Sequence, residues 1–246
     1  MTFPSISLII PYYNEAERID LMFEGIGEFA DKWAGDYEII LVDDGSNDGS
    51  ERLINEHRVY QRIMKEQRIT LLQQPNSGKG GALKLGVANA TKDYILTLDA
   101  DMATYPIELK NWLELKHTFR SDELLIGSRE LEQSVIHEVL MRKWIGNIFN
   151  YLIRKTVGLP FRDTQCGFKL YPAVIAKEVF SQLTTFGWSH DVEILLRVLR
   201  SGYSVVEMPV NWTAVKGSKI RVIKDSWIMF WEVVKIRKDL GIRHKP

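Results

Sequence analysis

Residues 94–101 read YILTLDAD, an apolar run of strand length that ends in the two aspartates Asp99 and Asp101. Similar apolar runs precede it, and segments of helical length separate them. The expected strands cover residues 6–10, 38–42, 69–72 and 94–98, and the expected helices cover residues 16–33, 50–66 and 79–90. Continuous apolar strands that alternate with helices indicate an α/β, Rossmann-like fold, with a mostly parallel sheet flanked by helices.

Polar clusters follow the first, second and fourth of these strands. They read PYYNE at 11–15, DDGS at 43–46 and DAD at 99–101. In a parallel sheet, ligands bind beyond the carboxyl ends of the strands. We therefore expect the clusters to converge on one crevice.

The DAD cluster suggests a metal site. Asp99 and Asp101 can share one cation, because carboxylate oxygens suit Mg²⁺ and Mn²⁺. Such a cation would neutralise charge on a departing diphosphate. An isolated pair of this kind more often caps the following helix, so the metal site is favoured only because of the neighbouring clusters.

Two other segments suit a nucleotide. Asp43 and Asp44 can accept hydrogen bonds from a base or a ribose, or can form a turn and a helix cap, and both alternatives stay open. The segment NSGKGG at 76–81 opens an expected helix, and its glycines and Lys79 suit phosphate. It lacks Walker A spacing, and no G-x-G-x-x-G follows the first strand, which disfavours a dinucleotide fold.

The second half of the chain is less regular. We expect strands at residues 124–126 and 205–208, and amphipathic helices at 140–157 and 225–239. Basic and aromatic residues in both helices favour a membrane surface, although both helices can instead simply cover the sheet. We expect a catalytic domain over residues 1–219, and a C-terminal amphipathic helix and tail over residues 220–246.

Composition narrows the class of protein. The chain has 246 residues, of which 45% are hydrophobic and 26% charged, with a formal net charge of zero. This is typical of a globular domain and gives no broad basic surface for nucleic acid. The single cysteine, Cys166, fits a reducing compartment. We see no signal peptide and no apolar run of membrane-spanning length, and expect a cytoplasmic protein, peripheral on the cytoplasmic face of a membrane.

In this order, PYYNE, VDDGS, NSGKGGAL at 76–83 and DAD resemble the family-2 GT-A glycosyltransferases. The later segments GSR at 127–129, DTQCGFKLY at 163–171, HDVE at 190–193 and VNWTAVKGSK at 210–219 are similar to the polyprenyl-phosphate branch, and within it to the dolichyl-phosphate β-glucosyltransferases. The resemblance implies a GT-A fold, a UDP-sugar donor, a polyprenyl or dolichyl phosphate acceptor, and Mg²⁺ or Mn²⁺. Thr213 and Ala103 stand where mannosyl-transferring relatives carry an arginine and often a metal ligand, which favours the glucosyl type.

The candidate site residues fall into overlapping groups. Those expected to bind the nucleotide sugar are Pro11, Tyr12, Glu15, Asp43, Asp44, Lys79, Asp99, Ala100, Asp101, Lys169 and Lys219. The expected metal ligands are Asp99 and Asp101, and the acceptor phosphate is expected to meet Arg129 and Arg142. The expected catalytic residues are Asp99, Asp101, Arg129, Asp191 and Lys219.

The acceptor decides whether a general base is needed. A phosphate monoester is largely anionic at pH 7, so transfer to a lipid phosphate requires no strong base. Asp191 and Glu193 lie where many relatives place a base, and they can here orient the sugar or a basic residue; His190 is expected to be structural. The alternatives are transfer to a saccharide with Asp191 as base, a non-catalytic nucleotide-sugar-binding protein, and a nucleotidyltransferase. Oligomeric state is not indicated.

Overall fold

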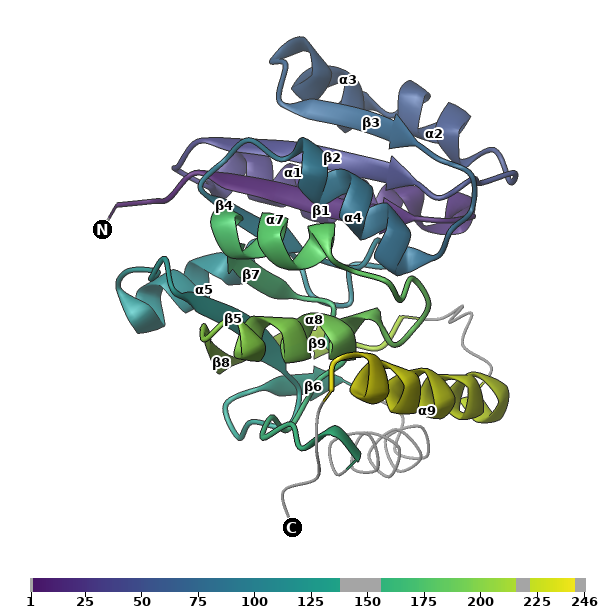
Figure 1. The fold of residues 1–246 in the computed structure, drawn as a ribbon. Helices are drawn as coiled ribbons and strands as arrows, with labels where there is room; N and C mark the ends of the chain where they lie inside the picture. The colour runs from purple at the N-terminus through teal and green to yellow at the C-terminus, as the bar shows by residue number, and fades with distance from the viewer. Residues whose placement is uncertain (1, 138–155, 216–221, 242–246) are drawn as a thin grey trace.

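The structure of the protein is a computed structural model that describes residues 2–137, 156–215 and 222–241. Its centre is a seven-stranded sheet with the strand order β3-β2-β1-β4-β7-β5-β8, with helices on both faces (Figure 1). The strands of this sheet are β1 (Ile6–Tyr12), β2 (Tyr37–Asp43), β3 (Ile69–Gln73), β4 (Tyr94–Thr97), β5 (Glu123–Ser128), β7 (Lys169–Pro172) and β8 (Ser204–Pro209). The predicted α/β fold is therefore confirmed.

The sheet is mostly parallel. Neighbouring strands β3, β2, β1 and β4 run parallel, as do β5 and β8. The exception is β7, which lies antiparallel between β4 and β5. Strand β7 was not expected from the sequence, because its four residues KLYP are too short to show a period and end in proline. Nor were β6 (Val135–His137) and β9 (Asn211–Thr213), which pair with each other outside the main sheet.

The helices depart from expectation in two ways. Residues 50–66 form two helices rather than one, because the backbone of His57 is extended (φ −74°, ψ 129°) and its Nδ1 accepts a hydrogen bond from the Val59 N–H as an N-cap. The helices at residues 108–116, 173–181 and 190–200 were also not expected from the sequence. The helices are α1 (Ile19–Lys32) after a 3₁₀ turn (Ala16–Arg18), α2 (Ser50–Glu56), α3 (Arg58–Lys65), α4 (Lys79–Asn89), α5 (Glu108–Lys116), α7 (Ala173–Ser181), α8 (His190–Arg200) and α9 (Val222–Asp239). Most of the helix expected at residues 140–157 lies outside the described residues.

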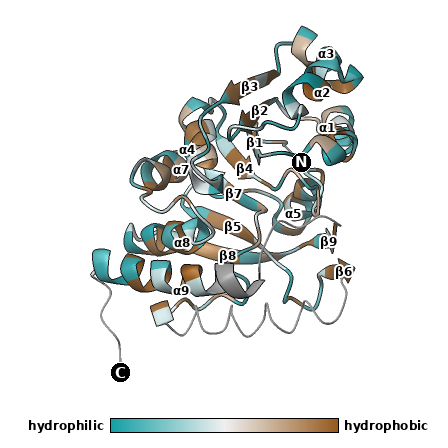
Figure 2. Cartoon of the chain, turned by 90° about the vertical axis from the view of Figure 1, so that its right-hand side faces the viewer, coloured by the Kyte–Doolittle hydropathy of each residue, from teal (hydrophilic) through white to brown (hydrophobic). Residues whose placement is uncertain are grey.

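Two hydrophobic clusters, one on each face of the sheet, explain the continuous apolar strands. In β1, Leu8 and Ile10 pack toward α1 and α5, whereas Ile9 packs toward α4, α7 and α8. Figure 2 shows these two helical layers on either side of the strands. Burial on both faces removes the polar alternation of a half-exposed strand.

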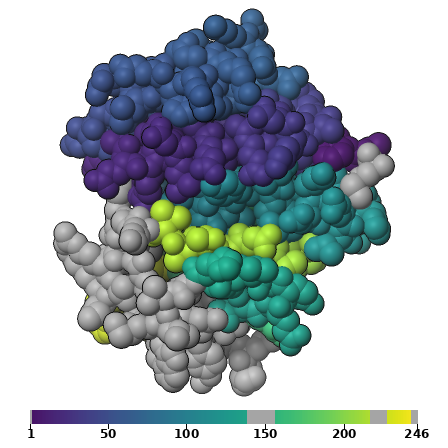
Figure 3. All heavy atoms as spheres, turned by 180° about the vertical axis from the view of Figure 1, so that it is seen from behind, coloured from purple at the N-terminus to yellow at the C-terminus, as the bar shows by residue number. Residues whose placement is uncertain are grey.

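The small β6–β9 sheet places β9, from the last part of the chain, beside the segment that follows the DAD cluster. The Thr213 N–H in β9 donates to the Ala103 carbonyl (2.8 Å), just after the DAD cluster. In Figure 3, the yellow-green segment around β9 lies between the teal segments of this face. No helix in the described ranges is both long and apolar enough to cross a bilayer.

Candidate functional site

An ion pair joins two strand-end segments of the site. Asp99 follows β4, Lys79 opens α4, and Lys79 Nζ lies 2.5 Å from Asp99 Oδ1. Burial opposes the charge on Lys79, but the carboxylates of Asp99, Asp191 and Asp101 outweigh it and raise its pKa above the ordinary value. Burial likewise opposes the charge on Asp99, while Lys79 holds the pKa of that carboxyl below its usual range. Both groups are therefore charged at neutral pH.

Asp101 is the second carboxylate of the cluster. Its Oδ1 accepts a hydrogen bond from the Ala103 N–H (3.1 Å), and burial together with Asp99 raises the pKa of Asp101. Two carboxylates that disfavour each other's charge are stabilised by a cation between them. Within the described ranges, no group of three or more His, Cys, Asp or Glu side chains is placed to hold a metal. Asp99 and Asp101 offer carboxylate oxygens of the kind that a hard divalent cation prefers, and their role as metal ligands stays a prediction.

A small pocket opens beside Asp99. A Cβ on Gly167 would lie 2.4 Å from Asp99 Oδ2, so only glycine fits this close approach. The residues lining the pocket are Leu98, Asp99, Ala103, Thr104, Cys166, Gly167, Phe168 and Trp212. Trp212 of β9 is thus placed next to the DAD cluster, although more than a hundred residues separate them in sequence.

Asp44 holds the loop that presents Lys79. Its Oδ1 accepts hydrogen bonds from the Ser77 N–H (2.9 Å) and the Gln74 side chain (2.7 Å), and its Oδ2 accepts one from the Gly78 N–H (2.8 Å). Gly78 has φ +94°, and a Cβ there would lie 2.5 Å from the Phe186 carbonyl oxygen. Asp44 therefore shapes the loop, and a direct contact with nucleotide stays a prediction.

The ends of β1 and β2 meet as expected. Tyr12 and Asp43 are opposite each other in register and nearly buried. Asp43 Oδ1 accepts from the Ser46 N–H (2.8 Å), so the turn alternative accounts for this oxygen. Burial, with Asp43 beside it, raises the pKa of Tyr12. Glu15 is tied to the same turn region, since its N–H donates to Ser50 Oγ (3.0 Å).

Lys169 is buried rather than presented to solvent. Only 1% of its side chain is exposed, and its Nζ donates to Asp191 Oδ1 (2.6 Å) and to the Cys166 carbonyl. Burial opposes the charge of Asp191, but His190, Lys169 and Lys79 hold the pKa of that carboxyl well below its usual range. This contact favours orientation of a basic residue as the role of Asp191, and direct contact of Lys169 with phosphate stays a prediction.

Glu193, the other acidic residue of HDVE, makes hydrogen bonds and an ion pair within the fold. Its carboxylate accepts hydrogen bonds from the N–H groups of Thr184 (3.0 Å) and Thr185 (2.7 Å), and pairs with Arg197 one helical turn away. The same turn supplies the Phe186 carbonyl, which accepts from the Gly80 N–H (2.9 Å). Glu193 thus supports the loop behind Lys79.

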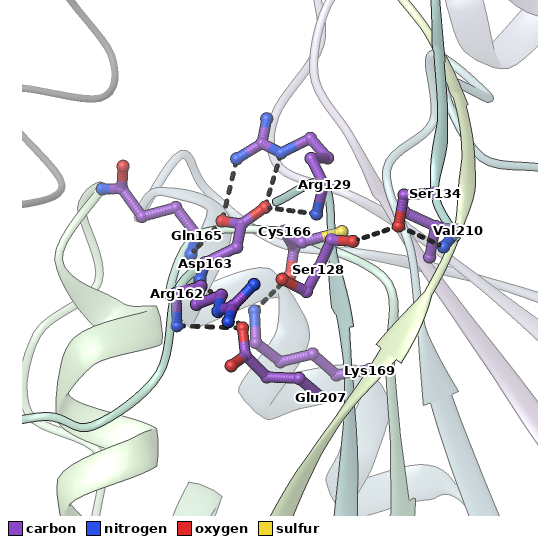
Figure 4. Close-up of polar contacts among 10 residues, drawn as sticks. All are labelled: Ser128, Arg129, Ser134, Arg162, Asp163, Gln165, Cys166, Lys169, Glu207 and Val210. Carbon is purple, nitrogen blue, oxygen red and sulfur yellow. Dashed lines mark hydrogen bonds and ion pairs between the residues drawn. The ribbon is translucent and has the colours of Figure 1, made fainter. Parts of the chain in front are cut away.

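Arg129 directly follows β5, and its guanidinium lies near the Trp212 ring. Its Nε and Nη2 donate to the two carboxylate oxygens of Asp163 (2.7 and 3.0 Å; Figure 4). Its guanidinium lies 5.5 Å from the Trp212 ring centre. Burial opposes the charge on Asp163, but Arg129 holds its pKa below the usual range. About a third of the Arg129 side chain is exposed, at 32%.

The remaining expected residues divide into two groups. Pro11 and Ala100 lie in the described structure, Pro11 paired with Val42 in the sheet and Ala100 buried between the two aspartates. Arg142 and Lys219 lie outside the described residues. No role was expected from the sequence for Asp163, Trp212 or Gly167, although they lie in the segments DTQCGFKLY and VNWTAVKGSK. Only their contacts distinguish them from their neighbours.

A mostly parallel sheet with an acidic pair at its central strand end, next to the lysine that opens α4, is the arrangement that the resemblance to the GT-A glycosyltransferases implies. The family model for glycosyl transferase family 2 matches residues 7–180. The chain belongs to this family, as its resemblance in sequence predicted.

The relatives that match most of this chain are named for the same enzymatic activity. The chain is 33% identical over 244 residues to a dolichyl-phosphate beta-glucosyltransferase of Dictyostelium discoideum, covering 94% of this chain and 73% of that protein. It is 32% identical to the dolichyl-phosphate beta-glucosyltransferase of Homo sapiens, covering 96% of this chain and 73% of the relative.

Solved structures show the same fold at lower identity. Glucosyl-3-phosphoglycerate synthase from Mycobacterium tuberculosis, in complex with Mn²⁺, UDP and glucosyl-3-phosphoglycerate, has a TM-score of 0.66 at 18% identity, covering 98% of this chain and 82% of that one. Mannosyl-3-phosphoglycerate synthase from Rubrobacter xylanophilus has a TM-score of 0.65 at 15% identity, covering 98% and 78%. At these identities, the comparison supports the fold.

Proposed function

We propose that the protein transfers glucose from UDP-glucose to a dolichyl or other polyprenyl phosphate, with inversion at the anomeric carbon. The observation that carries this proposal is the placement of two charged centres around Trp212. Asp99 and Trp212 line one pocket, and the Arg129 guanidinium lies 5.5 Å from the Trp212 ring. A donor diphosphate and an acceptor phosphate need such neighbouring sites. The names of the relatives support the choice of glucose and lipid phosphate.

The donor side is built around Asp99, Asp101 and Lys79. The aspartates would hold Mg²⁺ or Mn²⁺, and the bound metal would neutralise negative charge on the departing UDP. The complex of the mycobacterial structural neighbour with Mn²⁺ and UDP supports the use of a divalent metal with a UDP donor. Lys79, held by Asp99 and by the Asp44-bound loop, places a fixed cation beside the same diphosphate. Because these charges are positioned before the reaction, they stabilise the leaving group without reorganisation.

The acceptor side needs a cation more than a base. A lipid phosphate is an anionic nucleophile near pH 7, since its second pKa is about 6. Asp191 is a poor general base, because its pKa lies well below the ordinary range and its carboxylate pairs with Lys169. Arg129 would orient the acceptor phosphate, as guanidinium groups suit phosphate oxygens. One in-line displacement then converts an α-linked donor into a β-linked lipid phosphosugar.

A donor and acceptor panel tests this function. We expect UDP release and a β-linked product from UDP-glucose and farnesyl phosphate, and slower turnover with GDP-mannose or UDP-galactose. A saccharide acceptor in place of farnesyl phosphate should give no product above hydrolysis. A nucleotidyltransferase would instead release pyrophosphate from UTP and glucose 1-phosphate, and an α-linked product by NMR would contradict the proposed displacement.

We further propose that α9 binds an anionic membrane surface, where a polyprenyl phosphate is found. Trp227, Ile228 and Trp231 are exposed by 66%, 44% and 55%. At about 100° per residue, they share the face opposite the buried Met229 and Val233. Two lysines, Lys235 and Lys238, are exposed on the same outer face. Aromatic side chains and lysines on one face are typical of interfacial helices, and each lysine contributes about 1 kcal/mol near anionic lipid.

The position of α9 supports this membrane surface, and the single cysteine supports a cytoplasmic location for it. In Figure 2, α9 lies beside α8 at the edge of the helical layer. Cys166 is a buried free thiol, which fits a reducing compartment, and we propose that the membrane face is cytoplasmic.

Replacing both exposed tryptophans tests the membrane surface. The double variant Trp227→Ala/Trp231→Ala should lower partitioning onto vesicles of phosphatidylcholine and phosphatidylserine about tenfold or more, because two interfacial anchors are lost. Leu115→Ala, which removes an equally exposed apolar side chain (61%) from α5, is the control and should bind as the wild type does. Equal flotation of all three proteins would refute the role of α9.

A further inference from the structure

The Arg129 side chain is held by the Asp163 carboxylate, whose two oxygens accept four hydrogen bonds. Besides Nε and Nη2 of Arg129, Asp163 accepts from the Arg129 N–H (3.1 Å) and the Gln165 N–H (3.1 Å). Asp163 is 1% exposed. Such a carboxylate fixes both the backbone and the guanidinium of one arginine.

The backbone of Asp163 is itself fixed by a second acid. Glu207 Oε1 accepts hydrogen bonds from the N–H groups of Arg162 (2.9 Å) and Asp163 (3.0 Å). Glu207 lies in β8, opposite Ile126 of β5, the strand that directly precedes Arg129. Figure 4 shows Glu207 below the 162–163 backbone, with Asp163 between it and Arg129.

The hydroxyl of Ser134 contacts the end of β5 as well. Ser134 Oγ donates to the Ser128 carbonyl (2.6 Å) and accepts from the Val210 N–H (3.2 Å). The residue before Arg129 is therefore anchored to the segment between β8 and β9. Arg129 is thus attached to the β8 segment through both its side chain and its backbone.

We propose that Glu207 and Asp163 are positioning residues that set the Arg129 guanidinium for an anionic acceptor, Glu207 acting through Asp163. The inference rests on the proposed function, in which Arg129 meets the acceptor phosphate. An arginine has several rotatable bonds, and ordering them when the acceptor binds would lower affinity. Here the ordering is done during folding, so the cation is in place before the acceptor arrives.

The chemistry of Glu207 allows a sharp test. Glu207→Ala removes the oxygen that accepts from the 162–163 backbone, whereas Glu207→Gln keeps an oxygen acceptor at the same position. With UDP-glucose and farnesyl phosphate, Glu207→Ala should raise the acceptor KM about 10- to 100-fold and leave the donor KM within twofold. Glu207→Gln should restore most of the acceptor KM. Glu132→Ala, which removes an exposed carboxylate three residues after Arg129, is the matched control and should behave as the wild type.

A double-mutant cycle separates this inference from the proposed function. If Glu207 acts through Arg129, Glu207→Ala should add no further change in acceptor KM to Arg129→Ala. Additive effects, or equal losses in donor and acceptor KM, would overturn the positioning role. If Arg129→Ala leaves the acceptor KM unchanged, the assignment of Arg129 to the acceptor is wrong instead.

Binding without turnover gives a second measurement. Titration calorimetry with farnesyl phosphate should show weaker binding to Glu207→Ala and Asp163→Asn than to Glu207→Gln, at equal melting temperatures for the two Glu207 variants. Equal binding by all three would overturn the inference even if no glucose transfer occurs. Binding without glucose transfer in the wild type would contradict the proposed function alone.

Discussion

Asp101→Ala should lower glucose transfer about 10³-fold or more, because it removes half of the carboxylate pair that suits the metal and loses stabilisation of charge on the leaving diphosphate. Burial and the neighbouring Asp99 raise the pKa of Asp101, so its negative charge is disfavoured without a cation. Stability should be maintained or increased, since removing Asp101 relieves repulsion. The measurement is UDP release with UDP-glucose and farnesyl phosphate, at saturating Mg²⁺ or Mn²⁺.

Metal removal provides the companion measurement. Chelation should reduce wild-type transfer to the level of Asp101→Ala and should not reduce that variant further. Asp239→Ala, which removes an exposed aspartate at the end of α9, is the matched control and should remain fully active. Turnover of Asp101→Ala within tenfold of the wild type would place the diphosphate site elsewhere. A non-catalytic binding protein would show no turnover to lose.

Asp191→Asn should lower the free energy of unfolding by about 3–5 kcal/mol, because it leaves the buried Lys169 ammonium without its ionic partner. Lys169 and Asp191 are 1% and 9% exposed by side chain, and their charged atoms lie 2.6 Å apart. Urea unfolding at pH 7 measures the loss. The double variant Lys169→Met/Asp191→Leu should recover much of it, because a buried pair replaced by apolar side chains is often neutral.

The pH dependence of this loss has a defined sign. The pKa of Asp191 is lowered on folding, so its stabilisation is fully present above the unfolded pKa of about 3.9 and is lost as pH falls through the folded pKa. The stability gap between the wild type and Asp191→Asn should therefore be constant above about pH 5 and shrink below about pH 4. A gap that instead changes near pH 6 to 7 would mean that Asp191, or His190 with its Nε2 3.5 Å from Asp191 Oδ2, titrates there.

The sequence predicted those parts of the site that follow directly from a strand. PYYNE, VDDGS and DAD each follow an apolar run, and the direction of a parallel sheet is enough to bring their positions together. The pairing of Lys79 with Asp99 could have been predicted for the same reason, because α4 begins beside the same edge of the sheet. The family resemblance then supplied the branch and the chemistry.

Other features needed the folded chain. The break at His57 depends on one backbone conformation and one side-chain cap, which apolar periodicity does not report. The antiparallel strand β7 is too short for a pattern, yet it carries Lys169 into the core. The sequence does not show that Lys169 is paired inside the protein, because its partner Asp191 lies 22 residues away. Lysines are rarely buried without such a partner.

The sequence by itself determined the fold class, the family and the Asp99 and Asp101 cluster at the end of β4, because apolar runs and the residues that follow them are local. Only the tertiary structure decided what Asp99 and Asp101 stand next to. Lys79 neutralises one of them, Gly167 lies against the same carboxylate, and Trp212 lines the pocket beside it. These contacts join segments that are distant along the chain, and their free energy depends on burial and charge separation, which exist only once the chain has folded.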